Sequence, residues 1–242
     1  MGLSDKRLEP GDVKGMAQPK AWRDIILVAL PIVLLGAIGN VIGLSTVAGG
    51  ATVNLGYVLA IVVGALILGR QGSSWRLIGL ANPASWPKTI LAGVAAAIGA
   101  VAVFVLAQAI AVGVITVLGL EIPGIDQARF NPLEGNISLL LLMLVLAWTT
   151  IAFGEELFYR AFLMSRLVDH AGMGNKLAIL VSAIIFGCAH FAEGPVGIFS
   201  NGAFAVLFGW IYLRSGRNLW ITLIGHGLIN TLRFMLLYAG AT

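Results

Sequence analysis

The chain has 242 residues, of which 59% are hydrophobic, 31 are glycine and only 11% are charged. A water-soluble globule of this size needs far more charged side chains to cover its surface, so the composition excludes one and places the chain in a lipid bilayer. The net charge of +4 could suggest a nucleic-acid partner. The basic residues lie in loops between apolar runs instead of forming one face, so we expect no nucleic-acid binding.

Apolar runs with few charges predict the transmembrane helices, because a bilayer core about 30 Å thick needs about 20 helical residues. We expect an all-α, polytopic membrane bundle of about seven helices, within limits of six to eight. Residues 1–23 are expected to form a polar cytoplasmic tail, and residues 24–242 a single transmembrane domain. The predicted spans are 24–44, 54–69, 87–118, 137–160, 177–192, 196–213 and 218–239.

The distribution of Lys and Arg predicts the orientation, since positive residues accumulate on the cytoplasmic side. With the N-terminus inside, the tail holds five Lys and Arg residues, and the next three inner segments hold three, three and two. The outer segments hold only Arg129. The remaining one, Arg233, falls within the last span. This alternation predicts a cytoplasmic N-terminus and an external C-terminus.

Several polar side chains lie inside the predicted spans, where an ionisable group costs at least about 2.5 kcal/mol, which makes each one a candidate functional residue. They cluster in three spans between residues 137 and 239, the expected catalytic core. They are Glu155, Glu156 and Arg160, then Phe186 and His190, and last His226 and Asn230.

Helical spacing arranges these residues on faces. Glu156 and Arg160 are four apart and can pair, while Glu155 points about 100° away, toward a different neighbour. His226 and Asn230 are also four apart and share a face of the last helix. If these faces meet, the site holds a free carboxylate, imidazoles and an amide, a set that can activate water and stabilise an oxyanion.

Structural explanations exist for each residue alone. Adjacent Glu residues can be a solvated helix end, an intramembrane His a packed core residue, and an Asn a hydrogen-bonding contact between helices. Their joint occurrence in three helices favours function. We expect Arg233 to hold a carboxylate or to reach an interface, and Ser200 and Asn201 to be packing residues.

These three motifs resemble the CAAX protease and bacteriocin-processing family of intramembrane endopeptidases. Glu155, Glu156 and Arg160 match its E-E-x-x-x-R motif, Phe186 and His190 its F-x-x-x-H motif, and His226 and Asn230 its H-x-x-x-N/D motif. The motifs occur in the expected order, and the resemblance covers roughly Leu140 to Leu237. The segment Phe208 to Gly216 also looks like the bacterial branch.

The resemblance implies roles for the motif residues. Glu155 would be the general base that activates water and His190 would help to hold that water, while His226 and Asn230 would bind the oxyanion. Glu156, Arg160 and Phe186 would be supporting residues. The family is often called a metalloprotease, and zinc could be held by Glu155, His190 and His226. We favour a metal-independent mechanism, because the chain has no H-E-x-x-H string.

The expected partners are membrane lipid and a peptide or protein substrate, with or without a lipid group, and the expected location is a bacterial plasma membrane. The alternative function is that of a non-catalytic membrane protein for bacteriocin immunity or scaffolding. One difficulty concerns depth, because the predicted spans place His190 and His226 at different distances from the cytoplasmic side. Residues 161–170 could therefore be either an amphipathic elbow or a continuation of the fourth helix.

Overall fold

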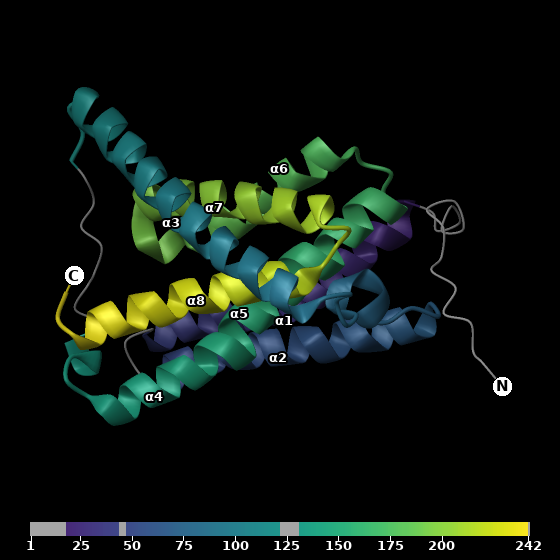
Figure 1. Cartoon of the computed structure of the whole chain (residues 1–242), viewed down its shortest axis with the longest axis horizontal. Helices are drawn as coiled ribbons and strands as arrows, with labels where there is room; N and C mark the ends of the chain where they lie inside the picture. Colours follow the sequence, from purple (N-terminus) through teal and green to yellow (C-terminus); the bar gives the residue numbers. More distant parts are fainter. Residues whose placement is uncertain (1–17, 44–46, 122–130, 242) are drawn as a thin grey trace.

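The computed structural model describes residues 18–43, 47–121 and 131–241, and within these residues the chain is all-helical (Figure 1). This confirms the predicted class. The helices, in chain order, are α1 (Gln18–Ile42), α2 (Val47–Arg70), η1 (Arg76–Leu80), α3 (Trp86–Val117), α4 (Ile137–Leu146), η3 (Ala147–Ile151), α5 (Ala152–Glu155), η4 (Glu156–Leu163), η5 (Arg166–His170), α6 (Asn175–Ala189), η6 (Phe191–Glu193), α7 (Gly194–Arg214) and α8 (Leu219–Tyr238).

Six helical segments in the described residues are long and apolar enough to cross a bilayer. They are α1, α2, α3, the continuous segment Ile137–His170, α7 with η6, and α8. The expected span 177–192 is the exception, because α6 has only 15 residues and is about 22 Å long at 1.5 Å per residue. The six long helices and the short α6 together agree with the expected bundle of about seven helices, within the limits of six to eight.

The fourth span continues well beyond its predicted end at residue 160. Helical turns run without a break from Ile137 to His170, and those of η3, η4 and η5 have the wider π-helical form. All eight residues of η4 are buried. Residues 161–170 are therefore a continuation of the fourth helix and not an elbow, because the charges that suggested a helix end at the membrane surface are buried against partners.

The predicted polar tail also ends earlier than expected, because α1 already begins at Gln18. Residues 1–17 and Arg129, on which the tail and part of the orientation argument rest, lie outside the described residues. α3 is one continuous helix of 32 residues despite its three internal glycines.

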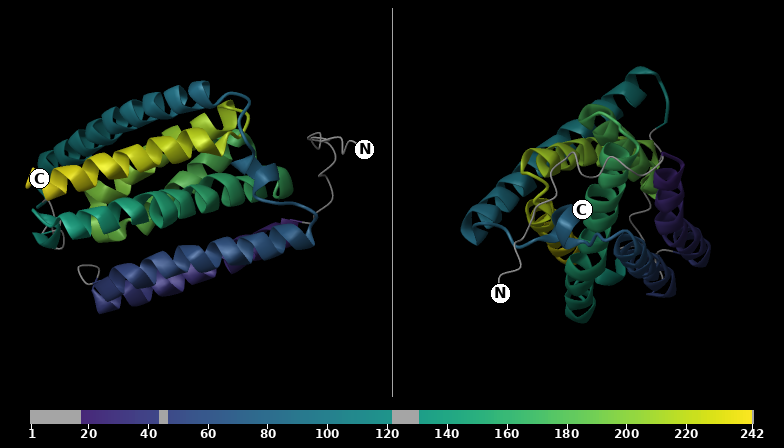
Figure 2. Two further views of the ribbon diagram at one scale, coloured as in Figure 1. Left: turned by 60° about the horizontal axis from the view of Figure 1, so that its bottom comes forward. Right: turned by 90° about the vertical axis from the view of Figure 1, so that its right-hand side faces the viewer.

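The helices pack as a bundle around the segment that carries Glu155 and Glu156. α1 and α2 lie side by side along one flank, α3 runs along α7 and α8, and α6 packs on α7 (Figure 2). Large apolar side chains cover the outside, with Val41 89% exposed and Val117 87% exposed. Such an outer surface faces lipid in an integral membrane protein.

One end of the bundle is closed by buried polar contacts between distant segments. The side-chain amide of Gln71 donates to the carboxylate of Asp24 (2.7 Å) and accepts from the Arg166 guanidinium (2.8 Å). Nearby, Arg217 makes a two-pronged ion pair with Asp169 (2.5 and 2.6 Å), which raises the pKa of Arg217. These contacts hold the ends of α1, α2 and η5 and the α7–α8 turn together.

Candidate active site

The centre of the site is a buried ion pair within one helix. Arg160 Nη1 lies 3.2 Å from Glu156 Oε1, and the two side chains are 1% and 0% exposed. The guanidinium also lies over the Phe186 ring, 4.6 Å from its centroid. The pairing predicted from the four-residue spacing is confirmed, and it keeps both charges buried without leaving either uncompensated.

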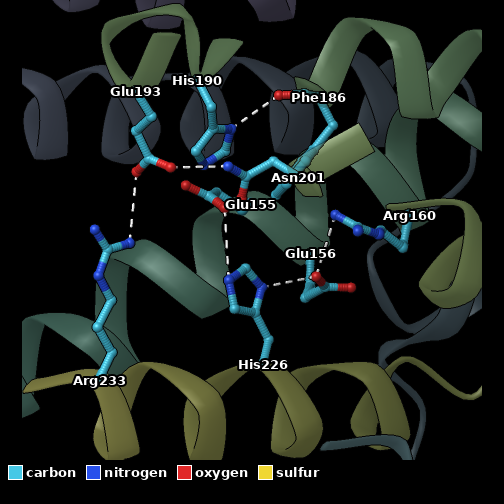
Figure 3. Close-up of polar contacts among 9 residues, drawn as sticks. All are labelled: Glu155, Glu156, Arg160, Phe186, His190, Glu193, Asn201, His226 and Arg233. Atoms are coloured by element: carbon cyan, nitrogen blue, oxygen red, sulfur yellow. Dashed lines mark hydrogen bonds and ion pairs between the residues drawn. The ribbon is translucent and has the colours of Figure 1, made fainter. Parts of the chain in front are cut away.

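Glu156 also fixes the orientation of His226 on α8. The Nδ1 atom of His226 lies 2.9 Å from Glu156 Oε1 (Figure 3). Because a carboxylate can only accept, Nδ1–H is the donor in this hydrogen bond. Phe204 packs against the imidazole at a centroid distance of 5.1 Å. Phe186 and Phe208 also lie near the ring, at centroid distances of 6.4 and 6.2 Å. The ring is therefore held by this hydrogen bond and by aromatic contacts, and its Nε2 atom faces the other way.

Glu155 lies on the side to which that Nε2 atom points. Its Oε2 atom is 3.7 Å from His226 Nε2, and the residue is only 7% exposed. Oε2 is buried without a hydrogen-bond partner among the described residues. The two adjacent glutamates thus contact opposite nitrogen atoms of one imidazole, as the expected 100° between their side chains requires. A water molecule or a substrate atom can bind between Glu155 and Nε2.

His190 is brought to the same place by the end of α6. The residue caps α6, its Nδ1 atom lies 2.9 Å from the Phe186 carbonyl oxygen, and its ring lies 4.6 Å from the Phe186 ring. If Nδ1–H donates to that carbonyl, Nε2 is left as an acceptor. Figure 3 shows the imidazole beside Glu155. The depth difficulty does not keep the groups apart, because the end of α6 places His190 beside Glu155 (Figure 3).

Asn230 follows His226 by one turn of α8. Its amide nitrogen Nδ2 is buried and has no hydrogen-bond partner among the residues that the structure describes. A buried amide N–H without an acceptor lowers the stability of the fold. Its presence beside the candidate site indicates that the Asn230 amide donates to an atom of a bound ligand.

A second cluster of polar side chains, Glu193, Asn201 and Arg233, lies beside the glutamates and histidines of the site. It was largely missed in the sequence. The amide nitrogen of Asn201 donates to Glu193 Oε2 (2.9 Å), and Arg233 Nη1 lies 3.5 Å from Glu193 Oε1 (Figure 3). The expectation that Arg233 holds a carboxylate is confirmed. Asn201 makes a polar contact that the packing interpretation did not foresee. The available signal was Glu193, an acidic residue in the short break between two apolar runs.

Ser200 has the packing role that its sequence context predicted. It is fully buried, and its hydroxyl donates to the Val196 carbonyl at 2.7 Å within the same helix.

The three residues weighed as zinc ligands do not form a ligand set. Among the described residues, no three His, Cys, Asp or Glu side chains are arranged to hold one metal ion. His226 Nδ1 is directed to Glu156 and His190 Nδ1 to a backbone carbonyl, which leaves the Nε2 atom of each ring for a further contact.

Comparison with known proteins agrees with the motifs. Residues 137–232 match the family described as type II CAAX prenyl endopeptidase Rce1-like. No curated protein and no solved structure matches the chain. The matched segment contains every residue of the three motifs, together with Glu193 and Asn201. Segment 137–232 is therefore similar to this family of CAAX endopeptidases, and the six long apolar helices indicate an integral membrane protein.

Proposed function

We propose that this protein is an intramembrane endopeptidase that hydrolyses peptide bonds of membrane-associated substrates with water activated by Glu155. The observation that carries the proposal is the buried carboxylate of Glu155, whose Oε2 atom lies 3.7 Å from His226 Nε2 without a hydrogen-bond partner among the described residues. It is a base with a free lone pair beside an oriented imidazole.

The first step is the activation of water. Glu155 accepts a proton from a water molecule as the water oxygen attacks the carbonyl carbon of the substrate. The Nε2 atom of His190 accepts a hydrogen bond from the other O–H of this water and so keeps the attacking lone pair directed at the carbonyl. Burial excludes competing bulk water from Glu155 and strengthens its electrostatic interactions with the reacting atoms.

The second step is the stabilisation of the tetrahedral intermediate. We assign its oxyanion to two donors on α8, the Nε2 of His226 and the Nδ2 of Asn230. A ring that donates from both nitrogen atoms is an imidazolium, and the Glu156 carboxylate on its Nδ1 side stabilises that positive charge. Removal of one such donor typically costs about 100-fold or more in kcat.

The third step is the collapse of the intermediate. The C–N bond breaks, and the proton that Glu155 took from water passes to the leaving nitrogen. The products are a carboxylic acid, which then releases its proton to water, and an amine, and Glu155 is again ionised. Arg160 and Glu156 do not touch the substrate in this scheme, since both are fully buried against each other and His226.

The first experiment compares protein termini by mass spectrometry in membranes that carry wild type, Glu155→Gln or Glu121→Gln at equal expression. Glu155→Gln is nearly isosteric and removes only the base, and Glu121 is an exposed residue beyond the end of α3 that serves as the matched control. We expect new termini with wild type and the control and none with Glu155→Gln.

Termini that are identical in all three membranes would contradict proteolysis. If a bacteriocin-protective phenotype then persisted in Glu155→Gln, the immunity or scaffold function would replace the enzymatic one.

We also propose that the reaction needs no metal, since no three His, Cys, Asp or Glu side chains among the described residues are arranged to hold one metal ion. Metal analysis of purified protein tests this for wild type and His190→Ala. We expect no stoichiometric zinc in either. One zinc per chain in wild type that is lost in His190→Ala would overturn the metal-independent mechanism.

A further inference from the structure

Helix α2 lies outside the matched segment 137–232 and carries none of the three motifs. Tyr57 on this helix is only 7% exposed and packs directly against the helix that carries Glu155. A Cβ atom at Gly154 would lie 2.9 Å from the Cβ of Tyr57. The absence of a side chain at Gly154 is therefore what allows Tyr57 to come this close to Glu155.

The hydroxyl of Tyr57 lies within interaction range of the Glu155 carboxylate and the Tyr159 hydroxyl. Tyr159 is itself 2% exposed, and its ring is held edge-on against Phe186 at a centroid distance of 4.9 Å. Three polar groups from two helices thus meet in a part of the site where apolar side chains would otherwise be expected.

The chemistry of these groups fixes the direction that hydrogen bonds among them would take. An ionised carboxylate can only accept, so the Tyr57 hydroxyl would donate to Glu155. The oxygen of Tyr57 would then accept from the Tyr159 hydroxyl. The two tyrosines would thus form a short donor chain that ends on the base.

We propose that Tyr57 is a positioning residue, which holds the Glu155 carboxylate by a hydrogen bond so that its Oε2 atom is directed toward His226. This inference rests on the proposed function of Glu155 as the base. It assigns to α2 a part in the active site that is independent of the three motifs. Tyr57 acts through Glu155 and does not touch the reacting atoms.

The test replaces the hydroxyl alone, with Tyr57→Phe. The ring remains to pack on Gly154, so folding is preserved. Tyr212→Phe is the matched control, because Tyr212 is also a buried tyrosine and its hydroxyl donates to the Ile78 carbonyl (2.6 Å), away from the site. Both variants lose one buried hydrogen bond, so any general loss of stability is common to them.

The first readout needs no substrate. A hydrophobic carbodiimide modifies protonated carboxyl groups in apolar surroundings, and mass spectrometry measures the modification of Glu155 and Glu156 separately. Because a hydroxyl donor favours the ionised carboxylate, we expect Tyr57→Phe to raise the labelling of Glu155 about tenfold. Labelling of Glu156 in the same protein, and of Glu155 in Tyr212→Phe, should stay at the wild-type level. Unchanged Glu155 labelling in Tyr57→Phe would overturn the inference.

The second readout is the hydrolysis of a substrate found by the comparison of termini. We expect Tyr57→Phe to lower kcat about tenfold or more with an unchanged KM, because Tyr57 orients the base and does not bind the substrate. Tyr212→Phe should leave both constants unchanged. A KM effect alone, or equal kcat losses in the two variants, would overturn the positioning role.

The two proposals fail separately. If Glu155→Gln and wild-type membranes show the same termini but Tyr57→Phe raises Glu155 labelling, the protease function is wrong and the contact between Tyr57 and Glu155 is supported. If Glu155-dependent termini appear but labelling and kcat are unchanged in Tyr57→Phe, the function stands and the role of Tyr57 is overturned.

Discussion

At the scale of single residues, the site is organised by a buried charge that is compensated from two sides. Glu156 accepts from His226 Nδ1 at 2.9 Å and pairs with Arg160 at 3.2 Å. An unpaired carboxylate in this buried place would greatly reduce the free energy of unfolding. The same contacts orient the imidazole toward Glu155, so the stability of the core and the geometry of the site depend on one network.

A substitution of Arg160 tests this dependence. Arg160→Met keeps much of the apolar volume but leaves Glu156 buried without its cation, so we expect a loss of about 3–5 kcal/mol in stability. Thermal unfolding in detergent measures it. The control is Arg214→Met at the exposed end of α7, where we expect a change within about 0.5 kcal/mol. An Arg160→Met protein as stable as wild type would show that Glu156 is not held as a buried charge.

At the scale of helices, α8 is positioned by the aromatic residue Trp148 of η3. Its indole Nε1–H donates to the Thr231 hydroxyl (3.0 Å), and a Cβ atom at Gly227 would lie 2.6 Å from its ring. Gly227 and Thr231 each follow directly after a candidate oxyanion residue, His226 or Asn230. The indole therefore holds the one turn of α8 that presents both donors.

Gly227→Ala is the test at this scale. A methyl group there overlaps the indole, so we expect α8 to shift, with a loss of about 1–3 kcal/mol in stability. A shift of that kind also lowers kcat, which the substrate assay measures. Gly36→Ala is the control, because a Cβ atom there meets nothing within 4 Å. If both variants behaved alike, close packing against Trp148 would not position α8.

At the scale of the whole molecule, we propose a membrane orientation from the charged residues near the end of the bundle that the polar contacts close. Asp24, Gln71 and Arg166 are linked there, and Arg217 pairs with Asp169. Most Lys and Arg residues of the chain lie in segments near this end, so we expect it to face the cytoplasm. The same argument places the outer end of α3 on the opposite side of the membrane.

Cysteine labelling in whole cells tests the orientation. In a Cys188→Ser background, we expect a membrane-impermeant maleimide to label Glu121→Cys in intact cells and Ala84→Cys only after permeabilisation. Both positions are exposed and lie just beyond opposite ends of α3. The reverse labelling pattern would invert the predicted topology.

Much of the fold and the candidate site could be predicted from the sequence. The apolar runs predicted the helices, and the four-residue spacing predicted the pairing of Glu156 with Arg160. The end of the fourth helix was predicted wrongly, because Arg160 and Arg166 look like a membrane surface in the sequence and are 1% and 2% exposed in the fold. The end of α6 was predicted at residue 192 but lies at Ala189, because apolar composition does not reveal that His190 ends the helix.

The membrane class, the family and the motif residues followed from the sequence alone, because composition, helical period and motif spacing are properties of short segments. Which groups meet followed only from the folded chain. Three contacts depend on how separate helices pack. Glu155 and Glu156 contact opposite nitrogens of His226, Asn201 binds Glu193, and Tyr57 approaches Glu155. Packing is set by complementary shapes across the whole bundle, such as Gly154 against Tyr57, which the local sequence pattern does not encode.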